Sequence, residues 1–306
     1  MITLKTIHKI ILARLACSCI LGLRKIQGKS EHVIAKRGGL LWNLDLKEGI
    51  DFSIYLLGGF EPRTLKLYTK IIKPGDIVLD IGANIGSHTL PLANLVGELG
   101  RVIAFEPTKF ALDKMYENIQ LNKDLCERIS LNQVMLVANG NDPLDPEIYS
   151  SWPLFDESNE LHKEHRGQLM KTTGAVVLTL DTALRQMNVS RIDFIKIDVD
   201  GHECSVISGG MNALKQYQPV ILMEFAPYLF RKKDGGTGEF EQLIAIFHNL
   251  GYSAYDVNSG SELPLIADQL SKLIPVGGSR NVLLVPSSKL CGRKSKYVNL
   301  NKVSSR

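Results

Sequence analysis

The 306-residue sequence lacks an apolar run of membrane-spanning length, and it lacks the cysteine spacings of zinc and redox sites. Its apolar stretch Leu15–Leu23 has nine residues between Arg14 and Arg24, whereas a spanning helix needs about 20. The five cysteines are scattered, which favours a reducing compartment and a cytoplasmic location. There is no internal repeat or low-complexity segment, and with 44% hydrophobic and 22% charged residues the chain is not disordered.

The sequence also lacks a strong net charge, because 36 basic and 32 acidic residues leave only +4. The charge is unevenly distributed. Residues 1–37 contain eight Lys or Arg and one acidic residue, and residues 289–306 contain six Lys or Arg and no acidic residue. Residues 38–288 therefore carry a net charge of −9. An acidic body without a surface of alternating basic and aromatic residues argues against nucleic acid as a partner.

The basic ends flank a longer central region. Leu4–Leu23 predicts an amphipathic helix whose basic face could contact an anionic membrane from the periphery; a signal segment or a helix packed on its own domain are the alternatives. We expect residues 1–73 to form a leader with this helix and a strand pair, Leu40–Leu46 and Phe52–Leu57. Residues 289–306 are predicted to be a basic tail.

Residues 74–288 alternate apolar runs with helical patterns, which predicts a single α/β domain. Strands buried on both faces and separated by helices are typical of a doubly wound, largely parallel sheet. Residues 138–174 interrupt this pattern as an insertion rich in polar residues, predicted to shape an acceptor pocket through Trp152, His162 and His165. The predicted strands are Ile77–Ile81, Arg101–Phe105, Ile129–Leu136, Ile192–Ile197, Val220–Phe225 and Val282–Val285, and the predicted helices are Ser87–Val96, Lys109–Asn122, Glu203–Tyr217 and Gly238–Leu250.

The turn after the first of these strands predicts a cofactor site. Asp80 ends the strand, Gly82 and Gly86 allow a tight turn, and a helix follows, so a ligand can lie against the backbone near free amide groups. A nicotinamide-binding fingerprint would have a glycine at position 84. The asparagine there, Asn84, favours a smaller nucleoside cofactor that carries a carboxylate.

Glu106 follows the second strand, 24 residues after Gly82. This is close to the spacing at which an acidic residue binds ribose hydroxyls in nucleotide-binding folds. Its alternative role is to cap the helix that follows Pro107. In combination with the glycine turn, we favour ribose binding.

These motifs resemble the FkbM family of S-adenosylmethionine-dependent methyltransferases. The resemblance extends from Gly38 to Phe225 and rests on the segments DIGANIG at 80–86, AFEP at 104–107, TLD at 179–181 and IDFIKIDVDGHE at 192–203. It implies a seven-stranded Rossmann-like sheet with helices on both faces, S-adenosylmethionine as cofactor, and transfer to oxygen. Glu61 matches an upstream family glutamate that contacts the amino end of the cofactor, and Gln133 is a candidate for contact with adenine. At position 200 the family often has glutamate, which leaves the role of Asp200 open.

A second group of ionisable side chains follows the strand that ends near Ile197. Since catalytic groups in open α/β sheets gather at the carboxyl ends of strands, Lys196, Asp198 and His202 are the predicted catalytic residues. His202 is the natural neutral base, and Asp198 could orient it, bind the cofactor, or hold a Mg²⁺ ion together with Glu224. Alternatively, Asp200 or His202 caps the next helix.

The sequence therefore predicts a methyltransferase acting on a hydroxyl oxygen of a sugar, a glycan or glycolipid, or a secondary metabolite. A nicotinamide-dependent oxidoreductase on a related sheet and a non-catalytic binding module are the alternatives. Neither the acceptor nor the oligomeric state can be read from the sequence.

Overall fold

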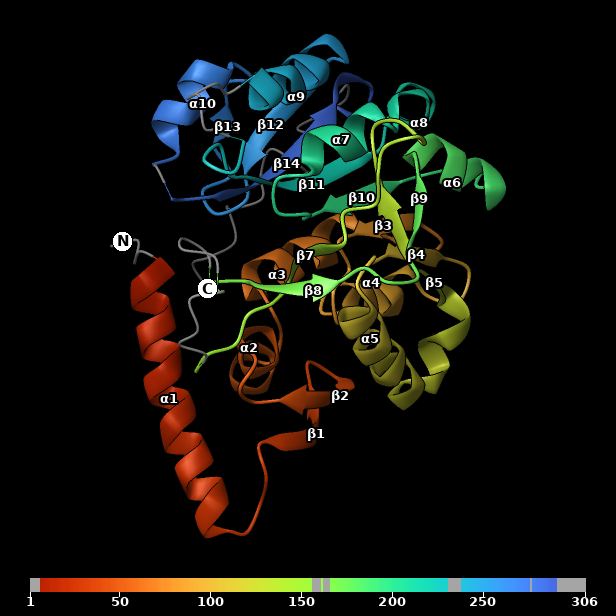
Figure 1. The fold of residues 1–306 in the computed structure, drawn as a ribbon. Coiled ribbons are helices and arrows are strands. Elements are labelled where there is room, and N and C mark those ends of the chain that lie inside the picture. Colours follow the sequence, from red (N-terminus) through yellow and green to blue (C-terminus); the bar gives the residue numbers. More distant parts are fainter. Residues whose placement is uncertain (1–5, 156–160, 162–165, 231–237, 276, 291–306) are drawn as a thin grey trace.

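The computed structural model describes residues 6–155, 161, 166–230, 238–275 and 277–290. An eight-stranded sheet in the order β13-β12-β14-β11-β10-β3-β4-β5 forms the centre of the molecule (Figure 1). Its strands are β3 (Ile77–Ile81), β4 (Arg101–Phe105), β5 (Ile129–Asn132), β10 (Phe194–Ile197), β11 (Val220–Phe225), β12 (Tyr252–Asp256), β13 (Glu262–Leu263) and β14 (Arg280–Pro286).

The sheet is largely parallel. Strands β5, β4, β3, β10 and β11 pair in parallel, and β14 runs antiparallel to both of its neighbours, β11 and β12. The predicted doubly wound α/β fold is therefore confirmed. The seven long strands match the expected number, and β13 adds a two-residue strand at the edge.

Successive strand residues point to opposite faces of a sheet, and here each face has its own apolar core. On β3, Val78 belongs to one core and Leu79 to the other. Helices α4 and α5 cover the first face and α6 to α9 the second. The helices are α1 (Thr6–Ile26), α2 (Gly49–Leu57), α3 (Pro62–Ile71), α4 (Thr89–Val96), α5 (Lys109–Leu121), α6 (Leu180–Gln186), α7 (Glu203–Ser208), α8 (Met211–Tyr217), α9 (Gly238–Asn249) and α10 (Ala267–Leu273).

Of the two strands predicted in the leader, the first is confirmed and the second is wrong. Leu40–Asp45 is a strand, β2, but it pairs with β1 (His32–Arg37), and the segment Phe52–Leu57 lies within α2. Buried Asp51 in the first turn of α2 accepts a hydrogen bond from the backbone of Asp45 and forms an ion pair with Lys114. These contacts hold the segment as a helix against β2 and α5. The division into leader, domain and tail at residues 73/74 and 288/289 stays a prediction.

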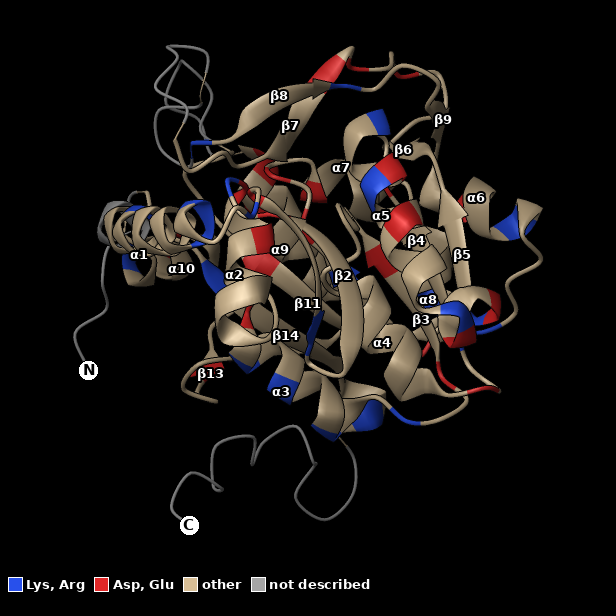
Figure 2. Cartoon of the chain, turned by 90° about the horizontal axis from the view of Figure 1, so that it is seen from below, with Lys and Arg blue, Asp and Glu red and all other residues tan. Residues whose placement is uncertain are grey.

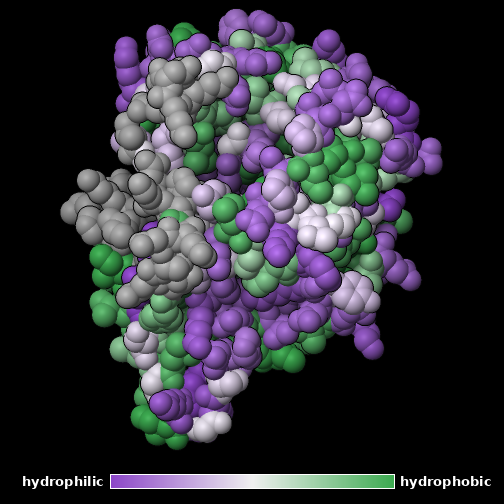
Figure 3. Space-filling view, viewed as in Figure 1, coloured by the Kyte–Doolittle hydropathy of each residue, from purple (hydrophilic) through white to green (hydrophobic). Residues whose placement is uncertain are grey.

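Helix α1 packs on the domain and also presents an apolar outer face. Ala13, Ala16, Cys17, Ile20 and Leu21 join the core on one side. The opposite side exposes large apolar residues, with Leu15 at 62% and Ile26 at 84%. Figure 3 shows apolar residues along the outer edge of this helix. Among the described helices, none is both long and apolar enough to cross a membrane.

The insertion at residues 138–174 contains an antiparallel hairpin of β7 (Glu147–Ser151) and β8 (Gln168–Lys171). His162 and His165 lie outside the described residues.

The predicted strand Ile129–Leu136 is broken at Gln133, after which β6 (Val134–Leu136) pairs with β9 (Val176–Leu178) instead of the main sheet. In Figure 2 the hairpin lies along the upper side of the molecule, with β6 and β9 to one side of it.

The predicted helix Glu203–Tyr217 is two helices separated by Gly209 and Gly210. A Cβ on Gly209 would lie 2.1 Å from the carbonyl oxygen of Val137, so the chain passes too close to this strand end for any side chain. Asp181 accepts hydrogen bonds from the backbone of Asn212 and Ala213 and so caps α8, whereas Thr179 caps α6.

Candidate active site

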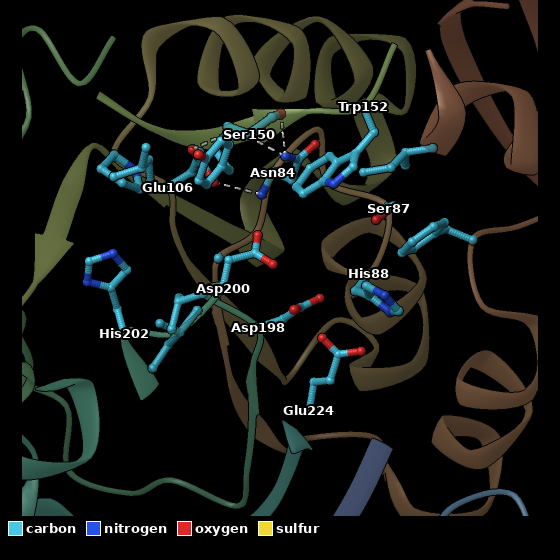
Figure 4. A pocket seen from close by; sticks show the side chains of 18 of the residues that line it. Asn84, Ser87, His88, Glu106, Ser150, Trp152, Asp198, Asp200, His202 and Glu224 are labelled. Atoms are coloured by element: carbon cyan, nitrogen blue, oxygen red, sulfur yellow. Dashed lines mark hydrogen bonds between the residues drawn. The ribbon is translucent and has the colours of Figure 1, made fainter. Parts of the chain in front are cut away.

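A cavity of about 610 Å³ lies at the carboxyl ends of β3, β4, β10 and β11 (Figure 4). Its floor includes Gly82, Glu106 and Asp198, each of which directly follows its strand, and Glu224 near the end of β11. Helices α1 and α2, β6 and the β7–β8 hairpin contribute to its walls. A volume of this size is typical of a small-molecule or cofactor site.

The glycine turn after β3 passes directly against β10. Gly82 has φ +76°, and a Cβ at this position would lie 1.8 Å from the carbonyl oxygen of Asp198. Asn84 also adopts a positive φ, of 48°, and its side-chain amide donates hydrogen bonds to the backbone and hydroxyl oxygens of Ser150 on β7. Gly82 and Asn84 line the cavity, whereas Gly86 turns the chain into α4 behind it.

Glu106 is buried at the end of β4 and lines the same cavity. Its Oε1 accepts hydrogen bonds from the backbone and hydroxyl of Thr108, and its Oε2 accepts one from the backbone N–H of Asn84 at 3.0 Å. Burial raises the pKa of Glu106 above its ordinary value. A carboxylate oxygen can accept two hydrogen bonds, so Oε2 retains acceptor capacity for a ligand hydroxyl.

Lys196 lies between two carboxylates at the base of the cavity. Its Nζ is 3.7 Å from Asp80 Oδ1 and 3.4 Å from Asp198 Oδ2, and it donates a hydrogen bond to the carbonyl of Gly82. Burial lowers the pKa of Lys196, but the charges of Asp198 and Asp80 outweigh burial and raise it. Asp80 also accepts a hydrogen bond from Thr89 and does not line the cavity, so it supports Lys196 from behind.

Four acidic side chains line the cavity together with this lysine: Glu61, Asp198, Asp200 and Glu224. Burial, together with the negative charge of Asp198, raises the pKa values of Glu61, Asp200 and Glu224. Clustered carboxylates in a buried site repel one another and favour a positively charged ligand. The cavity floor is therefore suited to a cation.

The predicted Mg²⁺ site gains no support from this geometry. Within the described part of the chain, no three His, Cys, Asp or Glu side chains are arranged to hold a metal ion. Asp198 is paired with the ammonium group of Lys196, and Glu224 accepts a hydrogen bond from Ser279. These residues do not fit a resident divalent ion.

Two other predicted residues lie apart from this cluster. His202 lines the cavity, but its side chain forms no hydrogen bond or ion pair with the described residues, Asp198 included. In the view of Figure 4, Asp200 lies between His202 and Glu224. Gln133 donates hydrogen bonds to the carbonyls of Pro107 and Thr173 and is not among the lining residues. The structure thus places Gln133 behind the cavity wall.

The cavity wall contains a buried histidine, His88, that was not predicted from the sequence. His88 Nδ1 lies 3.1 Å from the hydroxyl of Tyr68. Its Nε2 lies 3.8 Å from Glu61 and has no hydrogen-bond partner in the part of the chain that the structure describes. Burial, reinforced by the charge of Lys196, lowers the pKa of His88, so its imidazole is neutral. The only signal in the sequence was its place in the turn that begins α4.

The Asp198–His202 loop is held by Glu203, which gives a pH prediction. Glu203 is buried, accepts hydrogen bonds from the backbone of Val199 and Gly201, and has its pKa raised by burial to about 7. Since the folded pKa exceeds the unfolded value of about 4.3, the folded state binds the proton more tightly, and stability falls as pH rises from about 4.3 to 7. Relative to Glu203→Gln, the free energy of unfolding of the unmodified protein should fall by about 3 kcal/mol over this range.

The measurement is urea unfolding at a series of pH values from 4.5 to 8. Exposed Glu98 provides the control variant, Glu98→Gln, which should follow the unmodified protein at every pH. If the Glu203→Gln curve also runs parallel to that of the unmodified protein, burial does not perturb this carboxyl as described.

Comparisons with known proteins identify the family of this chain. A family profile described as the methyltransferase FkbM domain matches residues 80–254. Hexuronic acid methyltransferase AglP of Haloferax volcanii is 26% identical over 165 residues, 53% of this chain and 61% of that protein. Methyltransferase sdnD of Sordaria araneosa is 29% identical over 154 residues, 43% and 59% of the two chains. The matches thus span less than two thirds of these relatives.

Among solved structures, a methyltransferase FkbM from Methylobacillus flagellatus matches at 13% identity and a TM-score of 0.40, covering 72% of this chain and 50% of that one. The profile match covers more than half of the chain and includes both the glycine turn after β3 and the Lys196–Glu203 segment. This protein therefore belongs to the FkbM methyltransferase family.

Proposed function

We propose that this protein transfers a methyl group from S-adenosylmethionine to a hydroxyl oxygen of a sugar, a glycan or glycolipid, or a secondary metabolite. The observation that supports this most strongly is the single cavity that joins the glycine turn and Glu106 to the carboxylate floor. Family membership supports the reaction class, and the name of the Haloferax volcanii relative supports an acceptor of the sugar type.

The residues present fit this cofactor, whose sulfonium supplies the activated methyl group when it is bound. Glu106 Oε2 has acceptor capacity for a ribose hydroxyl. The negative floor formed by Glu61, Asp198 and Glu224 suits a ligand with an ammonium and a sulfonium charge. We infer that Glu61 and Asp198 face the amino end of the cofactor and that Gly82 and Asn84 contact it through the backbone. The predicted adenine contact of Gln133 receives no support from its position.

The chain must align a hydroxyl with the methyl group and remove its proton. We infer that His202 serves as the base, because it lines the cavity and has no partner within the described structure that would occupy its imidazole. Lys196 keeps Asp198 in place through their ion pair and so acts as a positioning residue. The β7–β8 hairpin, through Trp152, supplies apolar surface to the acceptor side.

The simplest test is thermal stabilisation by ligands. S-adenosylhomocysteine at 100 times its Kd should stabilise the full chain by about 2.7 kcal/mol, because it binds the folded state only. NAD should cause no shift. A shift with NAD and none with S-adenosylhomocysteine would overturn the proposal in favour of an oxidoreductase.

His202→Ala should lower turnover by about 10²- to 10⁴-fold, the usual contribution of a general base. The affinity for S-adenosylhomocysteine should stay within about twofold, because we infer a role for His202 in proton removal and none in binding the cofactor. Methyl transfer from labelled S-adenosylmethionine to a set of sugars and uronic acids would give the rate. If the variant keeps full turnover, the base is another group, and Glu224→Gln is the next variant to measure.

We also propose that the outer face of α1 lies on an anionic membrane surface. Ile11, Leu12, Leu15, Leu23 and Ile26 are exposed on this helix, and Figure 2 shows Lys and Arg along it. Helices that lie in a membrane interface combine an apolar face with Lys and Arg residues. The full chain should co-float with vesicles containing 30% phosphatidylserine, and Leu15→Ser/Leu23→Ser should remain in solution. Equal recovery of both proteins with the vesicles would contradict this proposal.

A further inference from the structure

One cationic side chain of the cavity is not used by any step above. Arg14 on α1 lines the cavity, and its Nε is buried without a hydrogen-bond partner among the described residues. Among the described carboxylates, none forms an ion pair with Arg14, although Glu61 and Asp198 line the same cavity. Its charge is therefore not neutralised by the acidic floor.

An arginine in this position requires an explanation because its guanidinium is always charged. Partial burial of an unpaired charge is costly, and such groups are normally paired or bind something. The guanidinium presents a planar fork of donors that matches the oxygens of a carboxylate or a phosphate. Arg14 thus has the chemistry of an anion-binding residue.

Arg14 comes from a different part of the chain than the residues inferred to bind the cofactor. The walls on its side include α1, which contacts α2, and the hairpin, whose Trp152 carbonyl accepts a hydrogen bond from the N–H of Gly49 on α2; Gly49 and Trp152 also line the cavity. These walls belong to elements outside the strands that hold Gly82 and Glu106. The cavity therefore combines an acidic floor, suited to a cationic cofactor, with one unpaired cation on a different wall.

We propose that Arg14 binds an anionic oxygen group of the methyl acceptor, an inference that rests on the proposed function. The acceptor is then a sugar or glycan that bears a carboxylate or a phosphate. In this arrangement α1 completes the acceptor site. An uncharged sugar of the same size would leave the guanidinium unpaired and would bind more weakly.

The test is calorimetric titration of the full chain saturated with S-adenosylhomocysteine. The probes are methyl glucuronide for a carboxylate, glucose 1-phosphate for a phosphate, and methyl glucoside as the uncharged comparison. At least one anionic probe should bind about tenfold or more tightly than methyl glucoside, and which of the two does so identifies the group. Arg14→Met should abolish this preference, and Arg14→Lys should keep part of it.

Lys25→Met is the matched control, because Lys25 is an exposed cation on the same helix that does not line the cavity. It should keep the full preference. The inference is overturned if the unmodified protein shows no preference, if Arg14→Met retains it, or if Arg14→Met weakens S-adenosylhomocysteine binding, which would assign Arg14 to the cofactor. Failure of the unmodified protein to bind S-adenosylhomocysteine would instead overturn the proposed function itself.

Discussion

Gly82→Ala is expected to destabilise the protein by about 4 kcal/mol or more, lowering Tm by about 10 °C. The new Cβ would lie 1.8 Å from the backbone oxygen of Asp198. That oxygen cannot move aside as a side chain can, because the N–H of Asp198 donates a hydrogen bond to Ile81 on β3. Strands β3 and β10 would have to separate, and the floor of the cavity would change. Differential scanning calorimetry gives Tm, and calorimetric titration gives the affinity for S-adenosylhomocysteine.

Gly86→Ala is the control for this variant, since Gly86 has a similar positive φ of 86°. Its Cβ would meet side-chain atoms, Leu90 Cδ1 at 2.7 Å and Met115 Cγ at 3.0 Å. The left-handed backbone costs both alanine variants about 1–2 kcal/mol, but only Gly82→Ala meets a backbone atom. Equal loss of stability in the two variants would show that the contact between the turn and β10 is not the reason for glycine at position 82.

Glu106→Ala is expected to weaken S-adenosylhomocysteine binding by about 10- to 150-fold, equivalent to about 1.5–3 kcal/mol. The variant removes a charged acceptor for the ribose hydroxyls. It also removes the acceptor of the Asn84 N–H, which orders the turn beside the cofactor. Isothermal titration calorimetry measures this affinity directly.

Glu106→Gln separates these two effects. The glutamine keeps one carbonyl oxygen for the local N–H groups but loses the negative charge, so its affinity should lie between those of the unmodified protein and Glu106→Ala. A matched stability measurement is needed, because buried Glu106 also accepts a hydrogen bond from Thr108. Unchanged affinity in both variants would mean that Glu106 does not bind the ribose.

The buried strands could be predicted from the sequence because continuous apolar runs end at charged or glycine residues. The ranges predicted for β3, β4 and β11 are those observed. The prediction was wrong at Phe52–Leu57, where an apolar run without a clear period occurs in a helix. It was also wrong at Gly209, where tertiary contact with Val137 ends a helix that its own residues would continue. Such failures depend on residues distant in the chain.

The same distinction applies to the site. Gly82, Glu106 and Asp198 could be chosen because each directly follows a strand, and strand ends meet at one edge of a parallel sheet. His88 and Arg14 could not, since their environment is made by Tyr68 and by the packing of α1 on α2. Asp80 lies near the end of β3, and Gln133 directly follows β5, but neither side chain lines the cavity.

The central claim is that the cavity at the carboxyl ends of β3 and β4 binds S-adenosylmethionine. A crystal structure of the full chain with S-adenosylhomocysteine tests it most directly. We predict that a ribose hydroxyl lies about 2.5–3.0 Å from Glu106 Oε2 and that the amino acid end lies against Gly82. Density for the compound outside this cavity, or a cavity without it at saturating concentration, would contradict the account.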